Sequence, residues 1–150
     1  MALLLSEGLL NLSDRKVLEI GCGQGDWLRE FIKWGASPSE IAGIDLLADR
    51  IEKARQLCPQ GVELLCGNAS KLPFPDSSFD IVAQFTVFSS ILDEQMKQEL
   101  AREMLRVMKD NGRILWYDFY VDNPTNRDTR GIRKTEIARM SLESQELYKA

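Results

Sequence analysis

Val17-Leu18-Glu19-Ile20-Gly21-Cys22-Gly23-Gln24-Gly25 is the stretch that decides the fold. Four strand-forming residues lead into three glycines at alternate positions, and an amphipathic segment opens at Asp26. Glycine suits a sharp turn between a strand and a helix, because it adopts positive φ and lets the backbone approach a ligand closely. The stretch therefore predicts a strand, a nucleotide-binding loop and a helix. A glycine turn that binds nothing is the alternative.

Further strands follow at regular intervals along the chain. Short runs rich in β-branched and aromatic residues alternate with amphipathic segments, and this pattern is typical of a parallel sheet with crossover helices. Because these runs lack polar alternation, we expect strands that are buried on both faces. The expected strands span residues 17–20, 41–44, 62–65, 79–85 and 113–117.

Apolar residues at intervals of three or four predict the helices. One helix is expected over 26–34, ended by Gly35, and another over 47–58, ended by Pro59. A longer helix begins at a capping Asp93, and its buried stripe runs to Met108 before Asn111-Gly112, which tolerates positive φ. We also expect a leading helix over 1–12 and a final helix that contains Ile137, Met140, Leu147 and Tyr148.

The composition narrows the function classes. The chain has 150 residues, 44% hydrophobic and 28% charged, which fits one domain over 1–150. A net charge of −4 gives no general positive field for nucleic acid. The absence of histidine excludes a histidine base, and three cysteines without a C-x-x-C pair indicate neither a zinc site nor a disulfide framework. With no apolar segment long enough for a membrane span and no signal-peptide pattern, we expect a cytoplasmic protein.

The spacing of the glycine loop limits the nucleotide. Dinucleotide enzymes use G-x-G-x-x-G, which brings helix amides to a pyrophosphate, whereas this loop reads G-x-G-x-G and follows Glu19. A carboxylate repels a pyrophosphate but attracts an ammonium or sulfonium group. Glu19 therefore favours a cationic ligand, although a strand glutamate paired with a lysine would explain it equally well.

Two later strand ends carry candidate ligands. Asp45 ends the second expected strand, 20 residues beyond Gly25, where a carboxylate accepts hydrogen bonds from both ribose hydroxyls of an adenosine. Asn68 follows the third strand, where its amide can bond the amine of adenine while Ala69 packs beside the ring. A plain turn is the alternative for Asn68.

At this point the sequence resembles the class I S-adenosylmethionine-dependent methyltransferases, and within them the small-molecule branch that includes the quinone-biosynthesis enzymes. The glycine loop, Gly43-Ile44-Asp45 and Gly67-Asn68-Ala69 are similar to the first three motifs of that family. The segments 72–82 (LPFPDSSFDIV) and 105–113 (LRVMKDNGR) resemble two later blocks. The resemblance covers residues 15–118.

The resemblance implies a site and a topology. It implies S-adenosylmethionine as cofactor, a Rossmann-like α/β sheet of order 3-2-1-4-5 with helices on both faces, and no C-terminal strand hairpin, since the chain ends early. The exposed edge that this leaves would favour a homodimer. Asn68 departs from the usual aspartate of the family and should be a weaker acceptor. The cofactor-binding residues carried over are Glu19, Gly21, Cys22, Gly23, Asp45, Leu46, Asn68, Ala69 and Gln84.

Methyl transfer from a sulfonium needs alignment and exclusion of water more than proton chemistry, so a missing histidine is tolerable. If the acceptor must lose a proton, Asp118, Asp122 and Asp128 are the available carboxylates, with solvated loop acids as the alternative. An aromatic group at the carboxyl ends of the fourth and fifth strands should line the acceptor pocket in part, and strand alternation puts about half of it in the core. It comprises Phe85, Phe88, Trp116, Tyr117, Phe119 and Tyr120.

The leading hypothesis is therefore a methyltransferase that acts on a small, largely apolar or aromatic molecule, with no nucleic acid or membrane as partner. A catalytically silent, cofactor-binding domain with a regulatory or oligomerising role is the alternative. A nicotinamide oxidoreductase is disfavoured by Glu19 and the glycine spacing. One basic loop could bind an anion locally, or be a solvated helix start; it carries Arg127, Arg130, Arg133 and Lys134.

Overall fold

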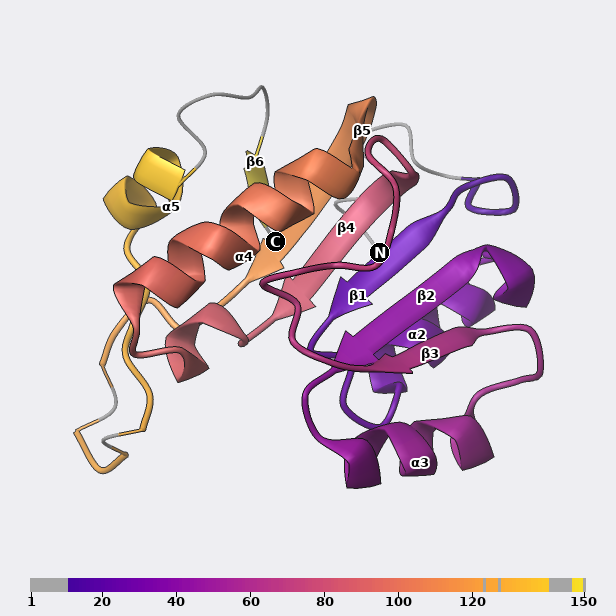
Figure 1. Cartoon of the computed structure of the whole chain (residues 1–150), viewed down its shortest axis with the longest axis horizontal. Coiled ribbons are helices and arrows are strands. Elements are labelled where there is room, and N and C mark those ends of the chain that lie inside the picture. Colours follow the sequence, from indigo (N-terminus) through magenta and orange to yellow (C-terminus); the bar gives the residue numbers. More distant parts are fainter. Residues whose placement is uncertain (1–10, 123, 127, 141–146, 150) are drawn as a thin grey trace.

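The computed structural model describes residues 11–122, 124–126, 128–140 and 147–149. Its centre is a parallel sheet with strand order β3-β2-β1-β4-β5-β6 (Figure 1). The order expected for the first five strands is confirmed. The strands are β1 (Val17–Ile20), β2 (Ile41–Asp45), β3 (Glu63–Cys66), β4 (Phe79–Phe85), β5 (Met108–Tyr117) and β6 (Leu147–Lys149).

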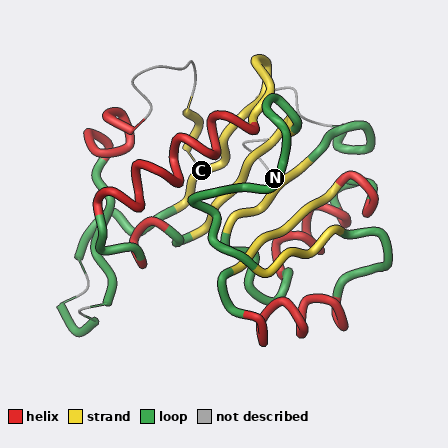
Figure 2. The backbone as a smooth tube through the Cα atoms, viewed as in Figure 1, coloured by secondary structure: helices red, strands yellow, loops and turns green. Residues whose placement is uncertain are grey.

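Helices cover both faces of the sheet, as expected (Figure 2). Alternate residues of β1 show why: Val17 packs with the helices α2 (Asp26–Lys33) and α3 (Ala48–Leu57), whereas Leu18 packs with α4 (Glu94–Val107) and α5 (Lys134–Met140). Two short 3-10 helices, Pro38–Glu40 and Phe88–Ser90, complete the described elements. None of the described helices is long and apolar enough to cross a bilayer.

The first two crossover helices end close to where the sequence predicts. Helix α2 ends just before Gly35, because the left-handed conformation of this glycine, at φ +102°, stops the helix. Helix α3 ends at Leu57, two residues before Pro59. Burial of both faces holds for β1, β2 and most of β4, but it is wrong for β3. This strand lies at the edge of the sheet, and only Leu64 is buried there.

The boundary between α4 and β5 differs from the expected one. The helix ends at Val107, and Met108 already pairs with Phe79 of β4, so Met108 belongs to the strand. Gly112 does not adopt positive φ. A Cβ atom at Gly112 would lie 2.6 Å from Met108 Cγ, so glycine is needed there for close packing. Because the apolar stripe of the helix continues into the strand, with Val107 and Met108 both buried, the sequence pattern does not mark where the helix ends.

The C-terminal prediction is wrong in part. Residues 147–149 do not continue the final helix but form β6, in which Leu147 pairs in parallel with Ile114 of β5. Since β6 covers that edge of β5, the reason for expecting a second copy there no longer holds. All strand pairs among the described residues are parallel. The leading helix expected over 1–12 falls almost wholly outside the described residues.

Candidate cofactor site

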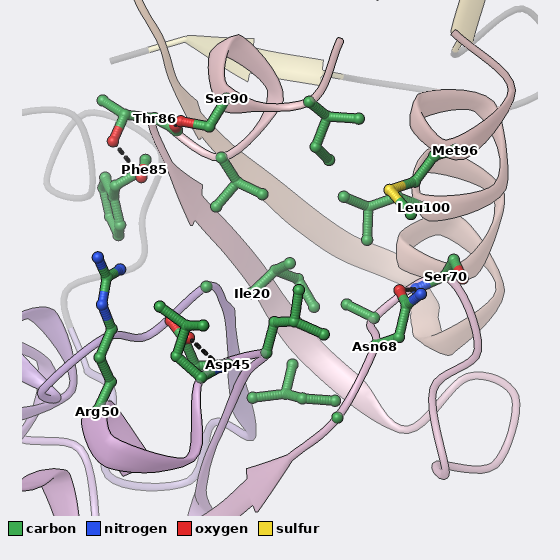
Figure 3. A pocket seen from close by; sticks show the side chains of 18 residues that line it. Ile20, Asp45, Arg50, Asn68, Ser70, Phe85, Thr86, Ser90, Met96 and Leu100 are labelled. Carbon is green, nitrogen blue, oxygen red and sulfur yellow. Dashed lines mark hydrogen bonds between the residues drawn. The ribbon is translucent and has the colours of Figure 1, made fainter. Parts of the chain in front are cut away.

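A pocket of about 400 Å³ opens at the carboxyl ends of the central strands (Figure 3). Loops after β1, β2, β3 and β4 contribute to its wall, and α4 closes one side. Asp45 lies near its middle, with Asn68 and Leu100 on one side and Arg50 and Phe85 on the other. The lining residues are Ile20, Gly21, Ile44, Asp45, Leu46, Leu47, Arg50, Gly67, Asn68, Ala69, Ser70, Phe85, Thr86, Val87, Ser90, Ile91, Met96 and Leu100.

The glycine loop forms part of the pocket through its backbone. Gly21, Gly23 and Gly25 all have positive φ, at +67°, +54° and +77°. A Cβ atom on Gly21 would lie only 2.4 Å from Val87 Cγ2, so a side chain cannot fit there without a shift. The Gly21 amide also donates to the Ile44 carbonyl at 2.8 Å. The loop is therefore folded tightly against the ends of β2 and β4, where a ligand can approach its main chain.

Asp45 is oriented by two backbone amides. Its Oδ2 atom accepts a 2.9 Å hydrogen bond from Gly23 N, and its Oδ1 atom accepts one of 2.9 Å from Leu47 N. The residue is only 6% exposed but lines the pocket. Each carboxylate oxygen retains a further lone pair, so the group can accept hydrogen bonds from a ligand without losing the bonds that hold it.

Glu19 lies behind the loop and not in the pocket wall. Alternation along β1 turns Ile20 into the pocket and Glu19 to the opposite face, where it is 2% exposed and its Oε2 atom has no hydrogen-bond partner among the described residues. Burial raises the pKa of Glu19 well above its usual range, and the charges of Asp26 and Asp45 raise it further. The alternation of β1 therefore separates Glu19 from the pocket lining.

Three more of the expected residues lie outside the lining. Gly23 contributes to the site by donating its amide to Asp45 Oδ2. Cys22 packs its Sγ atom against Gly43, where a Cβ would lie 2.8 Å away, and burial raises the pKa of this thiol. Gln84 is fully buried: its Oε1 accepts from Val87 N at 3.0 Å and its Nε2 donates to the Tyr117 carbonyl at 3.4 Å. Its side chain supports the turn after β4.

The structure brings the other five expected residues together, namely Gly21, Asp45, Leu46, Asn68 and Ala69. The Asn68 Oδ1 atom accepts from Ser70 N at 2.9 Å, so the side chain stabilises its own turn as well as facing the pocket. Leu46 is 67% exposed at the mouth, where it is free to cover a ligand.

Sequence reasoning missed the loop after β4, which supplies Thr86, Val87, Ser90 and Ile91 to the wall. Thr86 adopts φ +61°, a strained conformation for a β-branched residue. Its Oγ1 donates to the Phe85 carbonyl at 2.7 Å, and its carbonyl accepts from Ser90 Oγ at 3.1 Å. The sequence offers only Thr86 and the pair Ser89-Ser90 as signs of this loop, and such residues are common in turns that bind no ligand. Arg50, Met96 and Leu100 were missed as well. They lie in helices, and the apolar periodicity of a helix does not show which of its residues face a pocket.

None of the three candidate carboxylates lines the pocket. Asp118 accepts from the amides of Phe88, Ser89 and Phe119 at 3.1–3.2 Å, and burial raises its pKa. Asp122 accepts from Gly131 N at 2.8 Å, and Asp128 is exposed. The exposed Asp128 matches the alternative of a solvated loop acid, whereas the carboxylates of Asp118 and Asp122 accept from backbone amides of their loops.

The aromatic group divides differently from the expectation: two of its six residues lie in the core, one lines the pocket, and three are exposed outside the lining. Phe88 and Trp116 are buried with ring centroids 4.1 Å apart, whereas Tyr117 is 48% exposed and does not line the pocket. Phe119 and Tyr120 are likewise exposed and outside the lining. Only Phe85 reaches the pocket, and it stacks on Trp27 of α2 at 4.4 Å.

In the basic loop, Arg130 pairs with Glu94 at 3.0 Å and with Glu136 at 3.5 Å, so acidic partners offset its charge. Arg133 is exposed. Arg127 lies outside the described residues, as does the side chain of Lys134. The described part of this loop does not line the pocket.

Comparison with known proteins agrees with this arrangement. A family model for the methyltransferase domain matches residues 17–112. The ubiquinone/menaquinone biosynthesis C-methyltransferase UbiE of Pseudomonas aeruginosa is 35% identical over 112 residues, which are 71% of this chain and 43% of that protein. A tRNA N(3)-cytidine methyltransferase, METTL2 of Gallus gallus, is 31% identical over 69% of this chain and 30% of its own length. The chain thus spans less than half the length of these curated relatives.

Solved structures give the same result. The YcgJ protein of Bacillus subtilis superposes with a TM-score of 0.75 and 26% identity, over 91% of this chain and 64% of that one. An S-adenosylmethionine-dependent methyltransferase of Methanosarcina mazei reaches 0.60 with 29% identity, over 69% and 52%. With its glycine loop, its acid at the end of β2 and the match over residues 17–112, the chain belongs to the class I S-adenosylmethionine-dependent methyltransferases.

Proposed function

We propose that the protein binds S-adenosylmethionine in the pocket at the ends of β1, β2 and β4 and transfers its methyl group to a small-molecule acceptor. One observation carries the proposal: the Asp45 carboxylate is fixed by two backbone amides at the middle of the pocket, directly beside a glycine loop that has no room for a side chain at Gly21. A buried acceptor of hydrogen bonds next to bare main chain suits an adenosyl ligand with a cationic arm.

We assign the lining residues to separate parts of this cofactor. Asp45 would accept from the ribose hydroxyls, and Leu46 and Ala69 would enclose the adenine ring beside Asn68. The main chain at Gly21 would lie along the methionine portion. When bound, S-adenosylmethionine supplies a methyl group on a sulfonium, which is transferred as a cation equivalent to the acceptor.

Alignment of the acceptor is the main contribution that we assign to the protein in this reaction. Among the described residues, Asp45 is the only carboxylate that lines the pocket, and the proposal assigns it to the ribose. Asp118 already accepts from three amides. The described lining therefore offers no dedicated proton acceptor, which is consistent with a displacement that depends on geometry and on exclusion of water.

The apolar wall supports a small, largely apolar or aromatic acceptor. Val87, Ile91 and Met96 line the pocket, as does Phe85, which stacks on Trp27. The names of the two curated relatives point to different substrate classes, a quinone precursor and a tRNA. A net charge of −4 and the pairing of Arg130 with two glutamates favour the small molecule over nucleic acid. Cysteines 22, 58 and 66 are free, which fits a reducing compartment such as the cytoplasm.

Three measurements test the proposal. Titration calorimetry should show binding of S-adenosylhomocysteine and none of NAD⁺ at the same concentration, and thermal stability should rise with the first ligand alone. Transfer of labelled methyl from S-adenosylmethionine to quinone-like and phenolic acceptors then tests catalysis. Binding of NAD⁺ alone would refute the cofactor assignment, and cofactor binding without transfer to any acceptor would favour the catalytically silent alternative.

A further inference from the structure

The turn after β4, residues 86–91, is called the pocket loop here, because four of its residues line the pocket. Its first residue, Thr86, has φ +61°, which a threonine adopts only when its surroundings enforce it. Inside the loop the Ser90 amide donates to the Val87 carbonyl at 3.0 Å, a single turn of 3-10 helix. Such a short turn has little stability of its own. The pocket loop therefore depends on contacts from the rest of the molecule.

Gln84 of β4 supplies one of those contacts, and further ones come from the segment that follows β5. Asp118, at its start, accepts from Phe88 N at 3.2 Å and from Ser89 N at 3.1 Å. Farther along the segment, the Arg130 amide donates to the Ser89 carbonyl at 2.8 Å. Two residues that are distant from each other in the sequence thus hold the same turn of the pocket loop.

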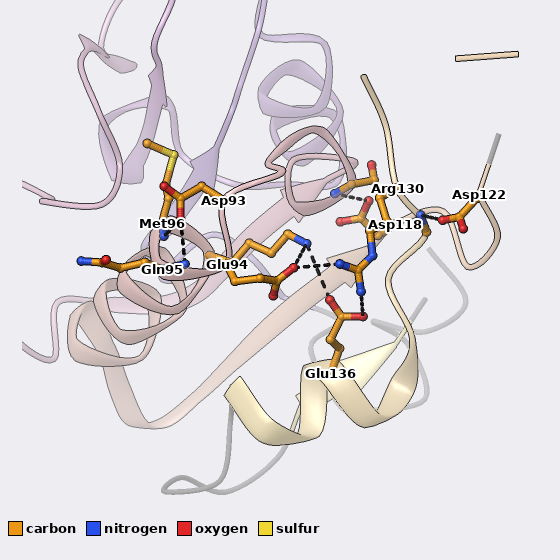
Figure 4. A network of polar contacts seen from close by, with 11 residues as sticks. Asp93, Glu94, Gln95, Met96, Asp118, Asp122, Arg130 and Glu136 are labelled. Atoms are coloured by element: carbon orange, nitrogen blue, oxygen red, sulfur yellow. Dashed lines mark hydrogen bonds and ion pairs between the residues drawn. The ribbon is translucent and has the colours of Figure 1, made fainter. Parts of the chain in front are cut away.

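Arg130 is itself anchored by its side chain. Its guanidinium lies 3.0 Å from Glu94 Oε1, at the first turn of α4, and 3.5 Å from Glu136 Oε2, in α5 (Figure 4). One residue therefore links the pocket loop, through its amide, to two helices, through its guanidinium.

Lys97 of α4 completes this charge cluster, which consists of Glu94, Lys97, Arg130 and Glu136. Its side chain is 1% exposed, and its Nζ lies 3.2 Å from Glu94 Oε1 and 3.6 Å from Glu136 Oε1. Two cations face two carboxylates, so the cluster is neutral as a whole. A buried ion pair is often no more stabilising than apolar packing of the same volume, but it fixes geometry, and loss of one member leaves a buried charge without a partner. None of the four residues lines the pocket.

We infer that the charge cluster is a positioning device, in which Lys97 and Arg130 fix the segment after β5 on α4 and thereby hold the pocket loop in its ligand-binding conformation. The inference rests on the proposed function only in its second test, which uses S-adenosylhomocysteine as the ligand. It assigns no chemical role to Lys97, which acts on the pocket through Glu94, Glu136 and Arg130.

Hydrogen exchange measured by NMR without ligand is the first test. In Lys97→Met, the amides of Phe88 and Ser89 should exchange at least tenfold faster, while the Leu18 amide in the centre of the sheet changes much less. Lys97→Met leaves two carboxylates facing Arg130 alone, and adding Glu136→Gln makes the cluster neutral again, so the double variant should recover most of the protection. Lys33→Met serves as the matched control, because it removes a lysine from an exposed pair with Glu30 and should leave both regions unchanged.

Binding of S-adenosylhomocysteine by the same variants is the second test. We expect about fivefold weaker binding in Lys97→Met, partial recovery in the double variant and no change in Lys33→Met. If Lys97→Met does not fold, the half-exposed Arg130 allows the same measurements on Arg130→Met. Equal acceleration of all amides, or an unchanged pocket loop in a folded variant, would overturn the inference. If the wild type itself binds no ligand, the proposed cofactor fails, and the exchange data still decide on the charge cluster.

Discussion

Gly23 donates its amide to Asp45 Oδ2 at 2.9 Å, so the glycine loop after β1 and the acid at the end of β2 form one unit. The second carboxylate oxygen is held by Leu47 N at the same distance. Because both partners are backbone amides, the position of the carboxylate is set by the fold and not by neighbouring side chains. The site is thus preorganised for a ligand that donates two hydrogen bonds.

Replacement of Asp45 should weaken ligand binding strongly. Asp45→Ala removes the proposed acceptor for the ribose hydroxyls, and hydrogen bonds to a charged group contribute about 1.5–3 kcal/mol, or roughly tenfold to a hundredfold in affinity. Calorimetry with S-adenosylhomocysteine measures this. Asp49→Ala, at an exposed acid in the first turn of α3, is the matched control. Unchanged affinity in folded Asp45→Ala would exclude Asp45 as the ribose ligand.

Two neighbouring glycines should respond differently to alanine. At Gly21, a Cβ would meet Val87 Cγ2 at 2.4 Å and φ is +67°, whereas at Gly23, with φ +54°, nothing lies within 4 Å of the Cβ. Backbone strain of about 1–2 kcal/mol applies to both variants, but overpacking adds about 1–3 kcal/mol for Gly21→Ala alone. Urea unfolding should show a larger loss of stability for Gly21→Ala than for Gly23→Ala. Equal losses would mean that Val87 moves aside at little cost.

The parts of the site that the sequence predicts are those set by local spacing. Three alternating glycines and Asp45 mark a turn and a strand end regardless of their surroundings. The orientation of Cys22 and Gln84 depends on which face of the sheet each residue meets, and no local pattern records this. Thr86 was missed because positive φ in a threonine is imposed by tertiary contacts. Strand β6, only three residues long, is defined by its pairing with β5, a contact between distant segments.

Replacement of Glu19 should change how stability depends on pH. The pKa of Glu19 is raised in the folded state by burial, and further by Asp26 and Asp45, from an ordinary value of 4.5. Between the unfolded and the folded pKa, the folded state binds more protons, so this group lowers stability as pH rises. The free energy of unfolding of Glu19→Gln minus that of the wild type should therefore increase with pH above about 4.5.

Urea unfolding at several pH values measures this difference. Glu63→Gln, at an exposed glutamate of β3, controls for the loss of one carboxylate from the chain. If the difference in free energy of unfolding between Glu19→Gln and the wild type stays constant from acid to neutral pH, burial does not raise the pKa of Glu19.

Asn68 should accept replacement by aspartate. Its Oδ1 already accepts from Ser70 N at 2.9 Å, and a carboxylate oxygen can take over that bond, so the turn is kept. The second oxygen of Asn68→Asp would replace the amide nitrogen in the pocket and accept from the adenine amine as a charged, stronger acceptor. We expect S-adenosylhomocysteine to bind Asn68→Asp as tightly as the wild type, or more tightly, by calorimetry. Asn68→Ala, which loses both the turn bond and the pocket contact, should bind more weakly. If Asn68→Asp folds but loses affinity, the amide must donate to the base, and the proposed contact with the adenine amine would be wrong.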